Sequence, residues 1–429
     1  MAHTSTRLYA TLRPIIKCGF SLFFRRIEVI GQSNIPQNKP VILVANHQNA
    51  MIDPVICCSY IPQQLHWLTR ADVFKNPTIK RLLTQFNMLP VYRERDRLSD
   101  MQERNQEVFN EVYERLKGNA MVCLFPEGTH RGKKQLMPLK KGVVRMATGA
   151  LEAGVKDAVI LPVGIDYEDY YAYRKTATIV IGTPIPLAQY EASLISDAAR
   201  AQNVLMLDIR TALKSVMVDI EHDNEYEVWM GLRPLINHLE DDTLGGQFHR
   251  YHSLLETLAT KSDAAAVLQS KGPQWFDAMK DAGLDEALFN PKGYRHVLAV
   301  LLGFPFAIIG YLCFYPWYLL IERIQRKLVK DPLFTNSIRI VFWTFFTPLY
   351  LIVWWLALTL SPLTWGQALL ALGLIAICGR LTLWWNDQAK RFGHWIKVQR
   401  FKRTQADTFQ QLMTLRSELI AVLRSVQSK

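Results

Sequence analysis

Most of the fold and the chemistry follow from one stretch, Val41-Ile42-Leu43-Val44-Ala45-Asn46-His47-Gln48-Asn49-Ala50-Met51-Ile52-Asp53-Pro54. Its apolar start predicts a short buried strand that ends at Asn46-His47. In one regular helix, His47 and Asp53 would point well apart around the axis. The stretch therefore predicts that His47 precedes a helix and that the loop folds the Asp53 carboxylate back toward it. A carboxylate on one imidazole nitrogen lets the other nitrogen accept a proton, which makes the pair a candidate general base. A histidine that caps a strand beside an unrelated aspartate is the alternative.

A second stretch has the same design of a buried strand that runs into a polar turn: Val122-Cys123-Leu124-Phe125-Pro126-Glu127-Gly128-Thr129-His130-Arg131. Together with Leu89-Pro90-Val91-Tyr92-Arg93 and Val159-Ile160-Leu161-Pro162-Val163-Gly164, these stretches resemble, in order, the four signature motifs of the glycerolipid acyltransferase superfamily. Members of that superfamily include glycerol-3-phosphate and lysophosphatidate (1-acylglycerol-3-phosphate) acyltransferases. The resemblance implies an enzyme that moves a fatty acyl chain from a thioester to a hydroxyl group in phospholipid synthesis.

Two details leave the acceptor open. Five residues separate His47 from Asp53, which resembles the yeast-type glycerol-3-phosphate/dihydroxyacetone-phosphate branch, whose members also carry membrane segments after the catalytic domain. Gly128-Thr129-His130-Arg131 is closer to the lysophosphatidate type, and Asn87 stands where the second motif usually has glycine. Lysophosphatidate is the favoured acceptor, glycerol-3-phosphate the second and another lysophospholipid the third. A catalytically idle lipid-binding scaffold is the alternative from another class.

The resemblance also implies roles for the candidate residues. His47 deprotonates the acceptor hydroxyl, Asp53 orients His47, and Arg93 binds phosphate. Acceptor binding further involves Glu127, Gly128, Thr129, Lys140 and Lys141, and the supporting positions are Asn46, Pro126 and Arg131. His130 and Arg131 flank the site and are further candidates for contact with phosphate. A solvated helix start is the alternative for the two lysines. No serine or cysteine lies in a nucleophile-elbow setting, so the acyl group is expected to pass directly from its donor, a thioester of coenzyme A or acyl carrier protein. No metal and no cofactor are expected.

The order of the elements predicts the organisation of the chain. Strands alternate with helices over residues 27–186, which predicts an α/β fold: a mixed sheet with helices on its faces and a site beyond the strand ends. Changes of composition then predict five parts: an interfacial amphipathic helix (1–26), the acyltransferase domain (27–222), a helical linker (223–292), a transmembrane region (293–386) and a basic cytoplasmic helical tail (387–429). For residues 1–26, the alternative is a first helix packed on the catalytic domain. The tail is expected to be a surface helix or a partner-binding helix.

Charge and hydropathy point to a membrane. The net charge of +12, the 49% hydrophobic residues and the 11 tryptophans favour anionic lipid as a partner over nucleic acid, for which no motif is present. Three apolar runs (296–321, 340–360 and 363–385) are long enough to cross a bilayer.

The positions of the basic residues make a simple topology difficult. The loop 322–339 and the tail are rich in lysine and arginine, which predicts that both lie in the cytoplasm. If the first apolar run crossed the membrane, the catalytic domain would lie on the opposite side, away from its cytosolic donor. We therefore predict that residues 296–321, interrupted by Pro305 and Pro316, form a re-entrant hairpin and that the catalytic domain lies on the cytoplasmic face.

Overall fold

The chain divides into two compact units. The computed structural model describes residues 7–93, 96, 99–237 and 243–427. Unit 1 comprises Met1–Asp219 together with the short segment Pro332–Ser337, and unit 2 comprises Ile220–Asp331 and Ile338–Lys429. The candidate site residues all lie in unit 1. The division into five parts stays a prediction.

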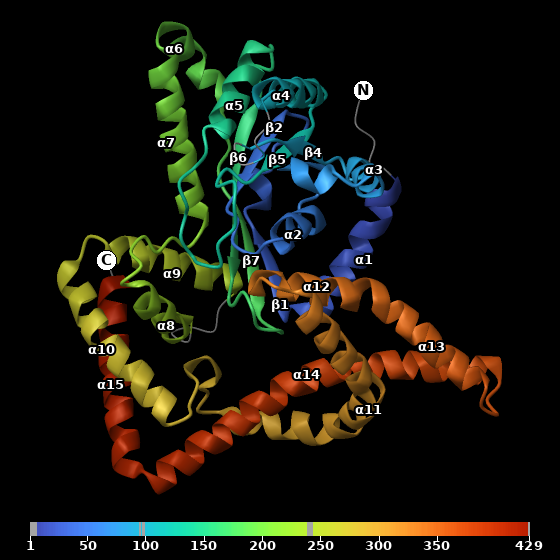
Figure 1. Cartoon of the computed structure of the whole chain (residues 1–429). Coiled ribbons are helices and arrows are strands. Elements are labelled where there is room, and N and C mark those ends of the chain that lie inside the picture. Colours follow the sequence, from blue (N-terminus) through green and yellow to red (C-terminus); the bar gives the residue numbers. More distant parts are fainter. Residues whose placement is uncertain (1–6, 94–95, 97–98, 238–242, 428–429) are drawn as a thin grey trace. The chain divides into compact units, whose positions relative to one another are not determined.

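Unit 1 is built on a mixed sheet of eight strands (Figure 1). The strands are β1 (Arg26–Ile30), β2 (Val41–Ala45), β3 (Leu65–Arg70), β4 (Leu89–Val91), β5 (Met121–Leu124), β6 (Val159–Tyr167), β7 (Thr176–Ile181) and β8 (Ile185–Pro186). Their order is β1-β7-β6-β2-β5-β3-β4, with β8 paired to β6. β6 pairs antiparallel with β7 and β8, and the other pairs are parallel. This confirms the predicted mixed α/β fold.

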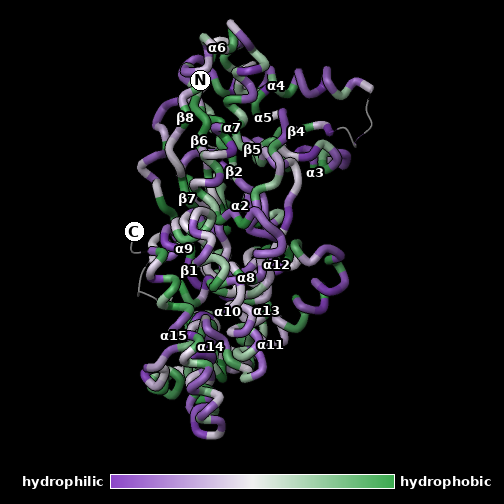
Figure 2. The backbone as a smooth tube through the Cα atoms, turned by 90° about the vertical axis from the view of Figure 1, so that its left-hand side faces the viewer, coloured by the Kyte–Doolittle hydropathy of each residue, from purple (hydrophilic) through white to green (hydrophobic). Residues whose placement is uncertain are grey.

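Helices cover the sheet. Those of unit 1 are α1 (Arg7–Phe23), α2 (Ile52–Tyr60), α3 (Pro77–Gln85), α4 (Met101–Lys117), α5 (Gly142–Glu152), α6 (Glu191–Ser196) and α7 (Ala198–Val216). Ile42 and Val44 of β2 belong to one buried cluster with apolar residues of α4, α5 and α7. Successive side chains of a strand point to opposite faces, and all five residues of β2 are buried. Both faces of the sheet are therefore covered at β2, the strand that leads into the candidate site, and Figure 2 shows hydrophobic residues along these central strands.

The first helix packs on unit 1 through its apolar face. Phe20 and Phe23 of α1 are buried, and Arg13 donates hydrogen bonds to the backbone carbonyls of Ser59 and Pro62 around the end of α2. These contacts match the alternative of a first helix packed on the catalytic domain, and the interfacial location stays a prediction. Residues 1–6 of that predicted segment lie outside the described residues.

Part of unit 2 is a helical bundle. It contains α8 (Tyr226–Asn237), α9 (Leu244–Leu258), α10 (Ser262–Asp281) and α15 (Ala406–Gln427). α15 buries Leu412, Leu419 and Leu423, and its Arg416 forms an ion pair with Glu286 at 2.7 Å. The apolar side of the tail thus packs within its own chain and the rest of α15 is largely exposed; the predicted surface or partner-binding role stays a prediction.

Three helical segments of the described chain are long and apolar enough to cross a membrane. They contain α11 (Val297–Leu328), then α12 (Thr335–Val341) with a π-helical turn (Phe342–Phe346) and α13 (Thr347–Thr359), and finally α14 (Trp365–Thr404). α14 continues unbroken through residue 386, where the transmembrane region was predicted to end. α11 packs along α14 at small residues: a Cβ atom at Gly310 would lie 1.9 Å from Thr382 Oγ1.

α11 corrects one prediction. The expected hairpin of residues 296–321 is a single continuous helix that contains both Pro305 and Pro316. A proline inside a helix removes one backbone hydrogen bond and bends the axis, but it need not reverse the chain. The turns between and around the two prolines keep their other hydrogen bonds, so the apolar run stays helical.

Candidate active site

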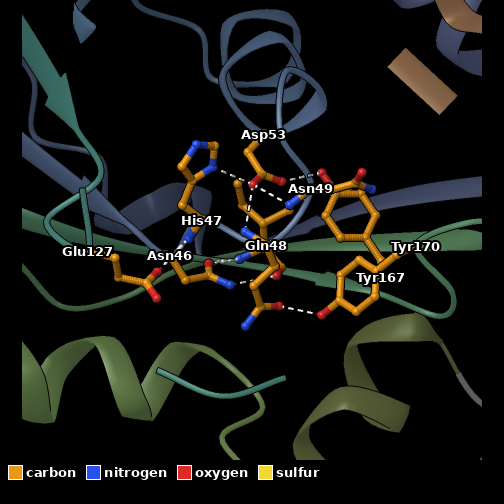
Figure 3. A network of polar contacts seen from close by, with 9 residues as sticks. Asn46, His47, Gln48, Asn49, Asp53, Glu127, Tyr167 and Tyr170 are labelled. Carbon is orange, nitrogen blue, oxygen red and sulfur yellow. Dashed lines mark hydrogen bonds and ion pairs between the residues drawn. The ribbon is translucent and has the colours of Figure 1, made fainter. Parts of the chain in front are cut away.

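The His47–Asp53 pair is present as predicted. β2 ends at Ala45, His47 lies in the following loop, and Asp53 lies in the first turn of α2. His47 Nδ1 is 2.8 Å from Asp53 Oδ2 (Figure 3). With the carboxylate accepting at Nδ1, that nitrogen carries the proton and Nε2 carries the lone pair. The loop thus gives His47 the tautomer that a general base needs.

The Asp53 carboxylate is fully enclosed and fully bonded. Its Oδ2 also accepts from the backbone amides of Gln48 and Asn49, each at 2.8 Å, and its Oδ1 accepts from the Tyr167 hydroxyl at 2.8 Å. Asp53 is 0% exposed. Burial raises the pKa of Tyr167, so this hydroxyl keeps its proton and remains a donor. Four donors therefore hold the carboxylate in the one position that orients His47.

Aromatic side chains surround the His47 ring. The ring stacks on Phe125 with centroids 4.0 Å apart, and Phe125 stacks on Trp67 at 4.9 Å. His130 packs edge-on against His47 at 5.3 Å. The imidazole is 15% exposed, so a substrate can reach one edge of a ring that packing holds in place.

Glu127 joins the loops that carry the first and third motifs. Its Oε1 accepts from the His47 backbone amide at 2.6 Å and its Oε2 accepts from that of Met137 at 3.0 Å. Burial raises the pKa of Glu127 to about 7, against the opposing effect of these two hydrogen bonds. The side chain is 1% exposed, and it holds the backbone of His47 in place through the hydrogen bond from the His47 amide. Contact of Glu127 with an acceptor stays a prediction.

The supporting residues hold the same corner of the sheet. Asn46 bridges β2 to β6, because its side chain donates to the Ile165 carbonyl at 3.0 Å and accepts from the Ile165 amide at 2.7 Å. The carbonyl of buried Pro126 accepts from the Lys140 amide at 2.8 Å. Gly128 adopts φ +70°, a backbone conformation that favours glycine, and it is exposed with Thr129 next to it.

The predicted basic residues differ in their contacts with the turn at Gly128. Arg93 Nη1 donates to the Gly128 carbonyl at 3.0 Å. The Lys140 side chain passes Gly128, and the Arg131 backbone amide donates to the His47 carbonyl at 3.3 Å. Lys141 is exposed at the N-cap position of α5, which matches the alternative of a solvated helix start. The side chains of Arg93 and Lys140 therefore reach the Gly128 turn, whereas the Arg131 guanidinium donates to the Gln135 side chain at 2.9 Å.

Sequence reasoning missed several residues of the site. Tyr167, Gln48 and Asn49 hold Asp53, and Tyr170 donates to the Gln48 side chain at 2.6 Å. Gln48 and Asn49 lie within the quoted stretch, and their backbone amides could have been foreseen as donors to a carboxylate folded back over the loop. Tyr167 and Tyr170 come from the end of β6 and the turn after it, and no local pattern connects them with Asp53. Among the described residues, no group of three or more histidine, cysteine, aspartate or glutamate side chains could hold a metal ion.

A mixed α/β sheet with a buried His–Asp pair at the end of a central strand, and arginine beside it, is typical of a hydrolase or transferase that activates a hydroxyl group. Residues 26–166 match the model of the family described as Acyltransferase. This chain therefore carries an acyltransferase-family domain.

Curated relatives agree with this family. Glycerol-3-phosphate O-acyltransferase 1 of Saccharomyces cerevisiae is 21% identical over 79% of this chain and 58% of its own length. The 1-acyl-sn-glycerol-3-phosphate acyltransferase of Bacillus subtilis is 24% identical over 28% of this chain and 56% of its own length. The chain thus spans less than two thirds of either relative. A solved structure, the 1-acyl-sn-glycerophosphate acyltransferase PlsC of Thermotoga maritima, aligns at 19% identity with a TM-score of 0.36, covering 48% of this chain and 78% of that one.

Proposed function

We propose that this protein is a membrane-bound acyltransferase that moves a fatty acyl chain from a thioester to a hydroxyl group of a glycerol-phosphate acceptor in phospholipid synthesis. The observation that carries the proposal is the hydrogen bond from His47 Nδ1 to buried Asp53, which leaves the lone pair on Nε2 of a ring that is 15% exposed. The acyltransferase-family domain over residues 26–166 supports the same chemistry. The His47–Asp53 pair and Arg93 are intact, which argues against a catalytically idle scaffold.

The reaction follows from the pair. His47 Nε2 accepts the proton of the acceptor hydroxyl while the oxygen of that hydroxyl attacks the thioester carbonyl carbon. Asp53 stabilises the imidazolium that forms, and the tetrahedral intermediate then expels the thiolate, which takes the proton from His47. No residue of the chain becomes acylated. The donor is a thioester of coenzyme A or acyl carrier protein, and the reaction needs no metal or further cofactor.

The acceptor carries a phosphate, for which the site offers cations. Arg93 and Lys140 both lie next to exposed Gly128, where a phosphate could accept from a guanidinium and from backbone amides. The match to a glycerol-3-phosphate O-acyltransferase extends over 79% of this chain, and this extent favours glycerol-3-phosphate as acceptor. Lysophosphatidate is the second candidate, favoured by the form of the third motif.

The location proposed is the cytoplasmic face of a bilayer that contains anionic lipid. The segment Pro332–Ser337 belongs to unit 1, although it lies between two apolar helices. Between Asp219 and Gly293 the described residues include no helix that could cross a membrane. Both ends of α11 would therefore lie on the same side as the catalytic domain, with α11 embedded but not crossing and with α13 and α14 crossing as a hairpin. The variants Lys292→Cys, Lys330→Cys and Ser361→Cys, each with a single cysteine, test this in sealed vesicles. We expect the cysteines at positions 292 and 330 to be labelled from one side and the cysteine at position 361 from the other. Labelling of positions 292 and 330 from opposite sides would contradict this topology.

Acyl transfer by the purified full chain in lipid tests the function. Glycerol-3-phosphate and lysophosphatidate are offered separately, each with an acyl-coenzyme A and an acyl-carrier-protein donor, and products are identified by mass. We expect one acylated product from one preferred acceptor. Absence of product from every combination, with folded protein, would contradict the proposed function.

A further inference from the structure

The short segment Pro332–Ser337 packs into the catalytic unit. It begins with a single 3-10 turn (Pro332–Phe334) and runs into the start of α12. Asn336 is buried, and its side-chain amide donates to the Tyr170 carbonyl at 2.8 Å. Leu333 lies against the backbone of Gly132, where an added Cβ atom would come within 2.6 Å of Leu333 Cδ2. These contacts attach the segment directly beside the loop of the third motif.

A row of rings connects the segment with the His–Asp pair. Phe334 packs edge-on against His130 with centroids 5.4 Å apart, and His130 packs edge-on against His47 at 5.3 Å. On its other side His47 stacks on Phe125. Phe334 is 36% exposed, so part of its ring remains open to a bound molecule. The reacting histidine and Phe334 thus lie along one aromatic surface.

Hydrogen bonds also connect the segment with the His47–Asp53 pair. Tyr170, whose carbonyl holds Asn336, donates through its hydroxyl to the Gln48 side chain at 2.6 Å. The Gln48 backbone amide in turn donates to Asp53 at 2.8 Å. The segment is therefore connected to both members of the pair, through rings to His47 and through hydrogen bonds to Asp53.

We propose that Pro332–Ser337 is a wall of the active site and that Phe334 is a specificity-determining residue that contacts the acyl chain of the donor. The inference rests on the proposed function. During transfer the thioester carbonyl must lie next to the hydroxyl at His47 Nε2, and its methylenes must then leave along an apolar surface. The ring of Phe334 offers such a surface next to His130 and His47, and the segment continues on both sides into apolar helices. Burial of each methylene against the ring favours long chains over short ones.

Chain-length preference tests the role of Phe334. Wild type, Phe334→Ala and the matched control Phe345→Ala, at an aromatic residue 38% exposed, are compared with butyryl and palmitoyl donors. We expect Phe334→Ala to lower kcat/KM for palmitoyl transfer about tenfold while butyryl transfer changes little, because a butyryl chain has few methylenes to bury against the ring. The control should keep the wild-type ratio of the two donors.

A binding experiment separates this inference from the proposed function. Butyl and hexadecyl thioethers of coenzyme A cannot transfer their chains, so their binding reports the site without the reaction. We expect Phe334→Ala to weaken hexadecyl binding about tenfold and butyl binding little. A wild type that transfers no acyl group but shows this binding pattern would overturn the function and keep the acyl-chain contact. Equal effects on both chain lengths, or effects equal to those of Phe345→Ala, would overturn the inference.

Discussion

The candidate site of unit 1 and the contact of α11 with α14 in unit 2 bury different kinds of residue. Around the site, polar and charged side chains are enclosed, and the Asp53 carboxylate alone accepts four hydrogen bonds. On α11 and α14 the large apolar side chains are outside, with Leu302 at 73% and Leu370 at 76% exposed, while buried positions include Gly310 and Thr382. The exposed apolar side chains match helices that are long and apolar enough to cross a membrane.

This contrast indicates which kind of substitution each region should tolerate least. A buried polar network loses much when one donor or acceptor is replaced, because the remaining partner stays unsatisfied. Helices in lipid associate through close approach of small residues, so they should be sensitive to size. We therefore expect charge and hydrogen bonding to decide the effects of substitutions near His47, and side-chain volume to decide them at the contact of α11 with α14.

Asp53→Asn should have the largest effect. Asp53 accepts four hydrogen bonds, whereas an asparagine has one side-chain oxygen to accept them and an amide group that only donates. An asparagine also no longer selects the His47 tautomer with the lone pair on Nε2. We expect kcat to fall on the order of 10³- to 10⁴-fold. Steady-state kinetics measure this, with Asp157→Asn at an exposed position as control. Activity within tenfold of wild type would show that the buried network does not control the site.

Arg93→Ala should act on the acceptor more than on the chemical step. Its guanidinium lies at the Gly128 turn, where we place the phosphate. We expect KM for the acceptor to rise about ten- to hundredfold, with a smaller change in kcat. Arg81→Ala, on the exposed surface of α3, is the control. An unchanged KM would show that the phosphate does not bind at this turn.

Glu127 should make stability depend on pH. The pKa of its carboxyl is raised by burial from the ordinary value of 4.5 to about 7 in the folded protein. Between these values the unfolded chain gives up a proton that the folded protein keeps, so stability should fall as the pH rises from about 5 to about 8, by at most about 3 kcal/mol. Thermal unfolding at several pH values measures this.

The control for that titration is a second substitution. Glu127→Gln should flatten the dependence of Tm on pH, whereas Glu114→Gln, at an exposed glutamate, should leave it as in wild type. The same slope in both variants would mean that another group titrates.

Gly310→Leu should have the smallest effect, and it concerns the apolar helices. A side chain there collides with Thr382, whereas Gly373 on α14 has open space around it. We expect Gly310→Leu to destabilise the α11–α14 contact by about 1–3 kcal/mol and Gly373→Leu to change little. Thermal unfolding in detergent compares the two. Equal Tm values would show that close packing at Gly310 is unimportant.

Much of the sheet and of the pair could be predicted from sequence because the signals are local. The run Val41–Ala45 is typical of a buried strand, and the His47 and Asp53 side chains are joined by a short loop. Glu127 was predicted as a site residue, but the contacts that Glu127, Tyr167 and Phe334 make could not be predicted in this way. Their partners are a backbone amide, a carboxylate and a ring that are distant in sequence, and only the folded chain brings them together. At α11 the prediction expected the two prolines to break the helix, but the continuous helix contains both of them.

The proposed chemistry depends on His47, held by Asp53, as the general base. Acyl transfer to the preferred acceptor by His47→Ala is therefore compared with wild type and with His222→Ala at an exposed histidine. We predict that transfer falls on the order of 10³-fold or more in His47→Ala and stays near wild type in the control, with both variants folded. Transfer by folded His47→Ala at a rate near that of wild type would contradict the account.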